Sequence, residues 1–379
     1  MIYLDNAATT YPKPESVYIA MDKANRELCV NAGRGSYKTA VAASELISET
    51  KKLLRRLTHA DIDSAVVFSP SITIALNQII NGLDYNKNSV VYISPYEHNA
   101  VARTIHHVSQ TIGFKVKHLP VNDELEIDID KMKYEFSKEK PSIVICTHVS
   151  NVTGYILPIK DIFHVAKIYG AICVLDSAQS MGLIPIDVRV MDVDIIAFAG
   201  HKTLYGPFGI GGFINVTGVK LSEFITGGTG SDSLNLEMPN HPEGRYEAAS
   251  SNVVAIAGLN EALKELSIEK NYDNERILTD YLITELGKIK KIKMLLPKNL
   301  DNHVGIVSFV ISGMASEDVG TILDEDFDIA VRTGYHCAPY IHDYIGDKKN
   351  SGTVRVGLGQ FNCKADIDAL INALNDIAG

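Results

Sequence analysis

The segment Cys173-Val-Leu-Asp176-Ser-Ala-Gln179 turns from apolar to polar within a few residues. Its first part is apolar, as expected of a strand that is buried on both faces of a sheet. A carboxylate and an amide, those of Asp176 and Gln179, follow at the carboxyl end of this strand, which is the edge at which open α/β sheets bind ligands. Taken alone, Asp176 is equally well explained as the N-cap of the next helix.

The same pattern recurs from about residue 64 to residue 216, where short β-branched runs alternate with longer amphipathic stretches. This alternation is typical of parallel strands joined by crossover helices. The predicted helices include residues 73–81, 99–111 and 160–169, with Thr73 as an N-cap or first-turn residue. The predicted strands are residues 65–68, 90–93, 116–119, 143–146, 172–175, 194–198 and 210–215. We therefore predict an α/β fold with a mainly parallel seven-stranded sheet.

The pattern changes after residue 216. A Gly-rich stretch and a polar run with two prolines predict a long loop from about residue 227. The rest predicts a smaller α+β unit, with helices at 252–267, 272–288 and 365–377 and a strand at 304–311. We expect a large domain of residues 16–255 and a small domain of residues 1–15 and 256–379.

The composition limits the classes of function. The 379 residues carry 36 Lys and Arg against 46 Asp and Glu, a formal charge of −10, which disfavours nucleic acid and anionic membranes as partners. No apolar run approaches the roughly 18 residues of a membrane span. The five cysteines form no C-x-x-C pair, and the N-terminus lacks a secretory signal pattern. We expect a cytoplasmic protein without a metal site.

A lysine follows the predicted strand at 194–198, in the sequence Ala199-Gly-His-Lys202, and glycines are dense in residues 206–212. This position is unusual, because burial disfavours the charge of a lysine. A lysine that forms a Schiff base has to lose its proton, so the position suits pyridoxal phosphate. That cofactor needs a lysine, an acid for its ring nitrogen and backbone amides for its phosphate, which Lys202, Asp176 and the glycine-rich loops supply.

Several separate motifs resemble those of the class V aminotransferases, and within them the cysteine desulfurase and selenocysteine lyase family. They are Tyr3-Leu-Asp-Asn-Ala-Ala-Thr9, Glu97-His-Asn-Ala100, Ser150-Asn-Val-Thr-Gly154, Asp176-Ser-Ala-Gln179, Gly200-His-Lys202 and Arg332-Thr-Gly-Tyr-His-Cys-Ala338. The motifs occur in the family's order along essentially the whole chain. The resemblance implies the aspartate-aminotransferase-like fold (fold type I), pyridoxal phosphate as cofactor and a homodimer.

The resemblance also implies roles around the cofactor ring. Lys202 is expected to bind the cofactor covalently, Asp176 to contact the pyridine nitrogen and Gln179 to contact the ring oxygen. His98 is expected to stack on the ring and to take part in catalysis. Asn151 is expected to contact both the cofactor and the substrate.

The phosphate and the substrate have their own expected ligands. The phosphate ligands implied by the resemblance are Ser71, Ile72, Thr73 and His201, with Ser250 reaching the phosphate of the partner subunit. The implied substrate ligands are Arg355, Asn151, Ala8 and Arg34. Among these, an arginine suits bidentate binding of a carboxylate.

Cys337 lies in a loop with Gly and Pro, and Arg332, His336 and His342 flank it. These neighbours predict an electropositive setting that favours a thiolate. Without the motif, an inert loop thiol is the simpler explanation, whereas the resemblance implies a catalytic cysteine. The other cysteines are expected in the core (Cys146 and Cys173) or belong to no motif (Cys29 and Cys363).

Together these features predict a cysteine desulfurase, which converts L-cysteine to L-alanine and leaves the sulfur as a persulfide on Cys337. The sulfur would then pass to an acceptor protein or a small thiol. One alternative is a selenocysteine lyase, acting on L-selenocysteine, or another class V lyase or aminotransferase that does not use Cys337. Another is a sulfur-relay scaffold that accepts a persulfide without generating it, although the presence of Lys202, Asp176 and Arg355 together argues against it.

Overall fold

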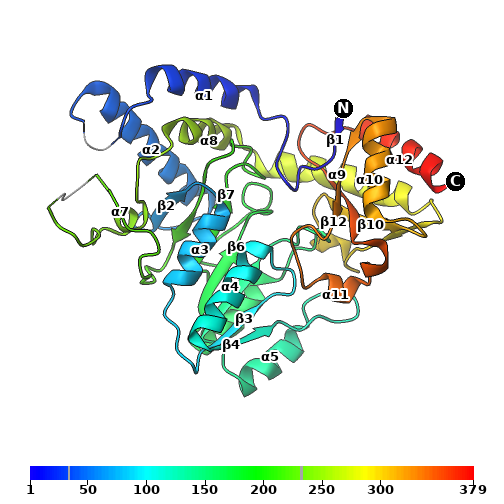
Figure 1. Cartoon of the computed structure of the whole chain (residues 1–379), viewed down its shortest axis with the longest axis horizontal. Helices are drawn as coiled ribbons and strands as arrows, with labels where there is room; N and C mark the ends of the chain where they lie inside the picture. Colours follow the sequence, from blue (N-terminus) through cyan, green and yellow to red (C-terminus); the bar gives the residue numbers. More distant parts are fainter. Residues whose placement is uncertain (33–34, 231–233) are drawn as a thin grey trace.

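The computed structural model describes residues 1–32, 35–230 and 234–379. Its largest sheet has the strand order β2-β8-β7-β6-β5-β3-β4 (Figure 1). β8 is antiparallel to both of its neighbours, and the other pairs are parallel. The strands are β2 (Ala65–Ser69), β3 (Val90–Ile93), β4 (Lys115–His118), β5 (Ile143–Thr147), β6 (Ile172–Asp176), β7 (Ile195–Ala199) and β8 (Gly211–Asn215). All seven predicted strands are present, which confirms the α/β class.

Helices cover both faces of this sheet. In β5, Val144 and Cys146 pack into one apolar core, and Ile143 and Ile145 pack into another. The helices of the first core include α5 (Ile129–Lys138) and α6 (Ile159–Ile168), and those of the second are α3 (Ile72–Gly82) and α4 (Asn99–Ile112). Burial on both faces explains why inner strands such as β5 and β7 are apolar throughout, whereas the edge strand β4 alternates Lys with other residues.

A second, antiparallel sheet with the order β12-β13-β10-β9 lies in the C-terminal part of the chain. Its strands are β9 (Ile292–Met294), β10 (Ile306–Ile311), β12 (Arg332–Gly334) and β13 (Thr353–Gly357). It shares an apolar core with α9 (Ile268–Leu286), α10 (Ser316–Phe327) and α12 (Lys364–Ala378). Leu4 belongs to the same core, and β1 (Ile2–Tyr3) pairs with β11 (Ile329–Ala330). We therefore propose that the first fifteen residues form one domain with residues 256–379.

The remaining helices lie in both parts of the chain. α1 (Glu15–Glu27) and α2 (Lys38–Leu57) both pack against α8 (Val253–Glu265). The short helices are α7 (Pro242–Tyr246), α11 (His342–Ile345), η1 (Leu300–Asn302) and η2 (Lys348–Asn350). Among the helices of the described residues, none has the length and apolarity needed to cross a bilayer.

Two details of the expected secondary structure are wrong. The long loop predicted from residue 227 contains α7, whose Glu243 pairs with Lys51 at 2.8 Å and with Arg55 at 2.6 Å, so ion pairs with α2 hold a turn that local sequence does not predict. α9 begins at Ile268, four residues earlier than predicted, because its first turn is polar and the apolar spacing begins only later.

Candidate active site

A cavity of about 210 Å³ lies beyond the carboxyl ends of the central strands. Thr147 and Asp176, the last residues of β5 and β6, line it, and so does Lys202, three residues after β7. This is the edge at which α/β sheets bind ligands. The predicted site residues that line this cavity are Ala8, Ser71, Ile72, Thr73, His98, Asn151, Asp176, Gln179, His201, Lys202 and Arg355.

The amine of Lys202 and the carboxylate of Asp176 perturb each other. Burial lowers the pKa of Lys202 to about 8, the nearby Asp176 opposes this shift, and Arg355 and Arg332 add to it. Burial raises the pKa of Asp176, while the amide of Ala178, which donates to Oδ1 at 2.9 Å, and the charge of Lys202 lower it. The cavity thus holds an amine that loses its proton far more readily than an exposed lysine.

One end of the cavity is suited to an anion. Ser71 is the N-cap of α3, since its Oγ accepts a hydrogen bond from the amide of Ile74, and Thr73 lies in the first turn. The amides of Ile72 and Thr73 therefore point beyond the helix without partners in it. His201 lies at the same cavity, and its buried Nδ1 has no hydrogen-bond partner. A Cβ at Gly211 would lie 2.7 Å from the Ile72 nitrogen, so this close approach requires glycine.

The N-terminal segment holds the backbone of the lysine loop. The carbonyl oxygen of His201 accepts hydrogen bonds from Thr9 Oγ1 at 3.0 Å and from Lys13 Nζ at 2.7 Å. Thr10 Oγ1 donates to the carbonyl of Lys202 at 3.1 Å. Burial lowers the pKa of Lys13 to about 7. Sequence reasoning missed Lys13, since nothing in the local sequence shows that it contacts a loop nearly 190 residues away.

His98 is fixed in one orientation as the N-cap of α4. Its Nδ1 accepts a hydrogen bond from the amide of Ala100 at 3.0 Å, so a neutral ring carries its proton on Nε2. Burial, with the charges of Lys202 and of nearby arginines, lowers the pKa of His98 to about 4. A neutral, fixed imidazole therefore lines the cavity.

Two arginines and one carboxylate lie at the opposite end. Arg355 is buried, its Nη2 pairs with Asp5 at 2.7 Å, and its Nη1 donates to the carbonyl of Asn151 at 2.9 Å. Its Nε is buried without a partner, and Arg332 lines the same cavity. Because Asp5 balances only one of the two guanidinium charges, this end keeps a net positive charge. Sequence reasoning missed Asp5 here and treated Arg332 only as a neighbour of Cys337.

Gln179 and Asn151 are already engaged by backbone atoms. Gln179 Nε2 donates to the carbonyl of Ala7 at 2.7 Å, and Asn151 Nδ2 donates to the carbonyl of His336 at 2.7 Å. Both side chains still line the cavity. They join the N-terminal segment and the cysteine loop to the strand ends.

Cys337 lies just outside this cavity. Its Sγ is 3.7 Å from Nη2 of Arg332, and its carbonyl accepts a hydrogen bond from the amide of Asn99 at 2.7 Å. His336 and Cys337 have φ values of 47° and 57°, a left-handed conformation that is costly for two consecutive non-glycine residues. The backbone conformation of this loop therefore constrains the position of the Cys337 thiol.

The electropositive setting predicted for Cys337 is only partly right. Burial holds the pKa of His336 well below its usual range, so this ring is neutral, and its Nε2 lies 2.6 Å from Thr353 Oγ1. His342 Nδ1 lies 2.6 Å from Asp347, whose carboxylate offsets any charge on the ring. The positive charge beside the thiol therefore comes from Arg332. The sequence shows residue types but not burial or partners.

Two predicted residues are not part of this arrangement. Ser250 is exposed and lines a separate cavity with Ser69 and Ile74. Arg34 lies outside the described residues.

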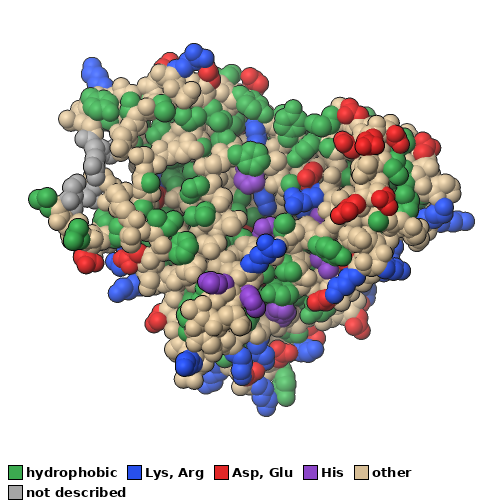
Figure 2. All heavy atoms as spheres, in the orientation of Figure 1, with side chains coloured by type: hydrophobic (Ala, Val, Ile, Leu, Met, Phe, Trp, Pro, Cys, Tyr) green, Lys and Arg blue, Asp and Glu red, His purple; other side chains and the backbone are tan. Residues whose placement is uncertain are grey.

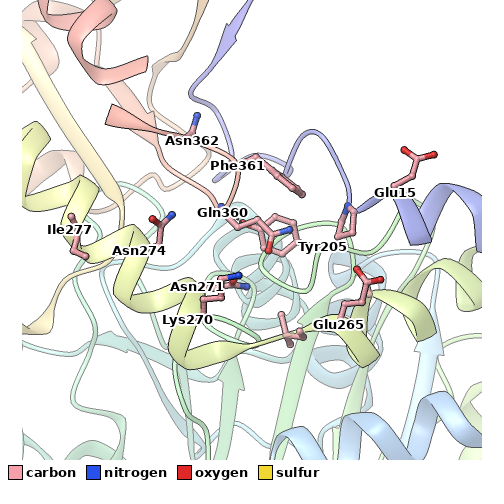
Figure 3. A pocket seen from close by; sticks show the side chains of 13 residues that line it. Glu15, Tyr205, Glu265, Lys270, Asn271, Asn274, Ile277, Gln360, Phe361 and Asn362 are labelled. Carbon is pink, nitrogen blue, oxygen red and sulfur yellow. Dashed lines mark hydrogen bonds between the residues drawn. The ribbon is translucent and has the colours of Figure 1, made fainter. Parts of the chain in front are cut away.

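The other cysteines and cavities do not compete as the site. Cys146 and Cys173 are fully buried, and burial raises the pKa of both thiols. No cluster of three or more His, Cys, Asp or Glu residues arranged to hold a metal ion occurs in the part of the chain that the structure describes. A larger cavity, of about 660 Å³, lies between the start of α1, the α8–α9 connection and residues 360–362 (Figure 3). None of the predicted site residues lines it.

Comparisons with known proteins agree with the geometry of the cavity. A family model described as aminotransferase class-V matches residues 2–370. A probable cysteine desulfurase of Pyrococcus abyssi is 31% identical over 387 residues, which cover 100% of this chain and 94% of that protein. A probable cysteine desulfurase of Aeropyrum pernix is 32% identical, with the same coverage.

Solved structures give the same result. The apo structure of a cysteine desulfurase from Thermococcus onnurineus superposes with a TM-score of 0.92 at 27% identity and covers 100% of this chain and 94% of its own. The S-sulfonic acid form of the cysteine desulfurase CsdA from Escherichia coli has a TM-score of 0.85 at 26% identity, covering 99% of this chain and 94% of its own. These matches confirm the predicted fold type I architecture.

Proposed function

Because the chain belongs to the class V aminotransferase family, we propose that it is an L-cysteine desulfurase that uses pyridoxal phosphate, releases L-alanine and leaves the sulfur on Cys337. One observation carries this proposal. Lys202, Asp176, His98 and Arg355 line one cavity, and Arg332, which lines the same cavity, lies 3.7 Å from the sulfur of Cys337. The names of the relatives support the same reaction.

The cavity fits pyridoxal phosphate. Lys202 would bind its aldehyde, Asp176 its ring nitrogen, and the faces of His98 and Ala178 its ring. The unpartnered Nδ1 of His201, with the hydroxyl of Thr73 and the free amides that begin α3, would bind its phosphate. When bound, this cofactor withdraws electrons from the Cα of an amino acid. Gln179 would contact the ring oxygen, and Asn151 would lie against the ring.

The substrate carboxylate would bind at the arginine end of the cavity. Arg355 is oriented by Asp5 and by the carbonyl of Asn151, and its Nε remains free. Arg332 adds the charge that Asp5 does not balance. This arrangement would direct the thiol of L-cysteine toward the side of the cavity where Cys337 lies, with Ala8 forming part of the wall.

The protein's own groups would carry the proton and the sulfur. The neutral amine of Lys202 would take the proton from Cα, and the neutral ring of His98 would lie against the face of the cofactor ring. An S–S bond would form between Cys337 Sγ and the substrate sulfur, while the Cβ–S bond breaks. The electron pair of that bond would end in a new C–H bond of alanine, so that no external oxidant is required.

The decisive experiment is a single incubation of the purified protein with L-cysteine in the absence of reductant. We expect about one alanine per active site and one added sulfur atom on Cys337, detected by amino-acid analysis and peptide mass spectrometry. Alanine without sulfur on Cys337 would support the lyase alternative. No alanine, with sulfur accepted only from an added persulfide, would support the relay scaffold.

The pKa of Lys202 predicts how fast the apoprotein takes up its cofactor. With a pKa of about 8, roughly one Lys202 in ten is neutral at pH 7. The rate of recolouring by pyridoxal phosphate should therefore rise with pH and level off above about pH 8, since only the neutral amine attacks an aldehyde. Asp176→Asn removes the charge that raises the pKa of Lys202, so the midpoint should move to lower pH. An unchanged midpoint, measured by stopped-flow absorbance, would contradict this coupling.

We also propose a cytoplasmic homodimer in which Ser250 reaches the cofactor site of a second copy. The exposure of Ser250 outside its own chain's cavity motivates this proposal. Sedimentation equilibrium should give twice the 41.4 kDa chain mass. A stable, active monomer would contradict the dimer and the role of Ser250.

A further inference from the structure

We infer that a second cavity, on the outer side of Cys337, is the site at which sulfur leaves the protein, and that it takes a small anionic thiol. This inference rests on the proposed desulfurase function. It adds where the sulfur atom leaves the protein and which chemical class of thiol accepts it.

The cavity is about 550 Å³ in volume and has two walls. Asn99, Arg103 and His106 form one wall, and their spacing of four and three residues puts them on one face of α4. The other wall is the cysteine loop with α11, including Tyr335, Pro339, Tyr340 and His342. The hydrogen bond from the Asn99 amide to the Cys337 carbonyl fixes the cysteine where the walls meet.

Cys337 lies between this cavity and the candidate active site. Cys337 lines the outer cavity, whereas Arg332, 3.7 Å from its sulfur, lines the inner one. A sulfur atom received from the inner side is therefore attached to a residue that is open to the outer side. Under the proposed function, the inner cavity of about 210 Å³ would already hold the cofactor and the substrate, which leaves the outer side for a second thiol.

The charges of the outer cavity favour an anion. Arg103, the arginine among its lining residues, is exposed and forms no ion pair with a carboxylate in the part of the chain that the structure describes. Lys348 is the one lining lysine and is already paired with Asp343. Figure 2 shows Lys, Arg and His side chains gathered on this face of the molecule, over α4 and α11. Such a basic site in a chain of net charge −10 attracts a carboxylate-bearing ligand locally.

The volume of the cavity suits a small molecule. At about 550 Å³ it lies within the roughly 300–1,000 Å³ typical of small-ligand sites. The walls are partly aromatic: Tyr335 lies 5.0 Å from the ring of His342, and Tyr340 lies 4.3 Å from that of His118. The aromatic walls suit the carbon chain of a thiol, and Arg103 suits its carboxylate.

The transfer step balances without an added oxidant or reductant. The acceptor thiolate attacks the outer sulfur of the Cys337 persulfide, and a new S–S bond forms on the acceptor. The S–S bond to Cys337 breaks, and its electron pair leaves with Sγ as a thiolate beside the guanidinium of Arg332. The proton lost by the acceptor thiol goes to solvent.

The test uses the cofactor-loaded protein with saturating L-cysteine and three thiols of similar size. These are 3-mercaptopropionate (anionic), 2-mercaptoethanol (neutral) and cysteamine (cationic), compared at equal thiolate concentrations by steady-state alanine formation. We expect 3-mercaptopropionate to be roughly tenfold more efficient than cysteamine in kcat/KM. Arg103→Gln should remove most of this preference and Arg103→Lys should restore it. The matched control Arg56→Gln changes the same charge on the exposed surface of α2 and should leave the preference intact.

Two measurements keep the inference separate from the proposed function. Alanine formed in the first turnover, without any added thiol, reports on the desulfurase reaction alone, and its absence would overturn both proposals. Alanine formed normally, but with equal efficiency for the three thiols or with a preference that Arg103→Gln does not change, would overturn the acceptor site alone. That result would instead point to a protein acceptor.

Discussion

Replacing Cys337 by alanine is expected to slow the conversion of L-cysteine to L-alanine by roughly two orders of magnitude or more. Lys202 and Asp176 act at Cα and do not need a thiol, whereas breaking the C–S bond in this reaction needs a nucleophile that receives the sulfur. The visible absorption of the bound cofactor, and its response to added L-cysteine, should remain. Peptide mass spectrometry should find no added sulfur elsewhere in the chain.

The matched control is Cys29→Ala, which removes an exposed thiol outside both cavities and should keep the full rate. L-Selenocysteine provides a second control, because its C–Se bond breaks more readily and elimination does not require a protein nucleophile. The Cys337→Ala variant should therefore keep appreciable activity on that substrate. If this variant desulfurates L-cysteine at the wild-type rate, Cys337 is a bystander and the lyase alternative is correct.

Replacing Lys202 by alanine is expected to abolish the visible absorption of the bound cofactor and to lower activity by roughly a thousandfold or more. Lys202 is the lysine that lines the cavity holding Asp176, so its loss removes both the covalent attachment and the base at Cα. The absorption spectrum of the purified protein, before and after addition of pyridoxal phosphate, measures the first effect. The exposed Lys52→Ala on α2 is the control and should be yellow and active.

Folding has to be checked in the same experiment. Removal of Lys202 also removes a partly buried charge, so the thermal unfolding midpoint of the Lys202→Ala apoprotein should be equal to or above that of the wild-type apoprotein. A folded Lys202→Ala protein that still shows the cofactor's visible absorption and full activity would place the cofactor on another lysine. A wild-type protein that stays colourless with pyridoxal phosphate would overturn the whole proposal.

The central sheet could be predicted because most of its strands, such as β5 and β7, are apolar and buried on both faces, and this signal is local. Some helices were not predicted although their sequences are amphipathic. α5, for example, buries only Met132 and Phe136, and Ile129 packs against the same core. α7 depends on ion pairs between Glu243 and α2, whose residues lie nearly 190 positions earlier. Such contacts have no trace in the sequence near the helix.

The residues of the candidate site also differ in whether a local signal in the sequence identifies them. Asp176 and Lys202 could be found because Asp176 ends a strand and Lys202 follows one, and strand ends meet at one edge of the sheet. Asp5 could not be assigned a contact, since its partner Arg355 lies 350 residues away. The electropositive setting expected around Cys337 was only partly right, because burial keeps His336 neutral and the carboxylate of Asp347 lies 2.6 Å from His342.

The N-terminal segment contacts residues that lie far along the sequence, and this affects the order in which the fold can assemble during synthesis. Residues 1–13 are made before their partners, which are His201 and Lys202, then β11, and finally Arg355, Gly357 and Asn362. A nascent chain can form the central sheet well before these last partners exist. Residues 1–13 therefore lack these last partners until most of the chain has been made. If the proposed function holds, the cofactor site would be complete only after Arg355 has been made.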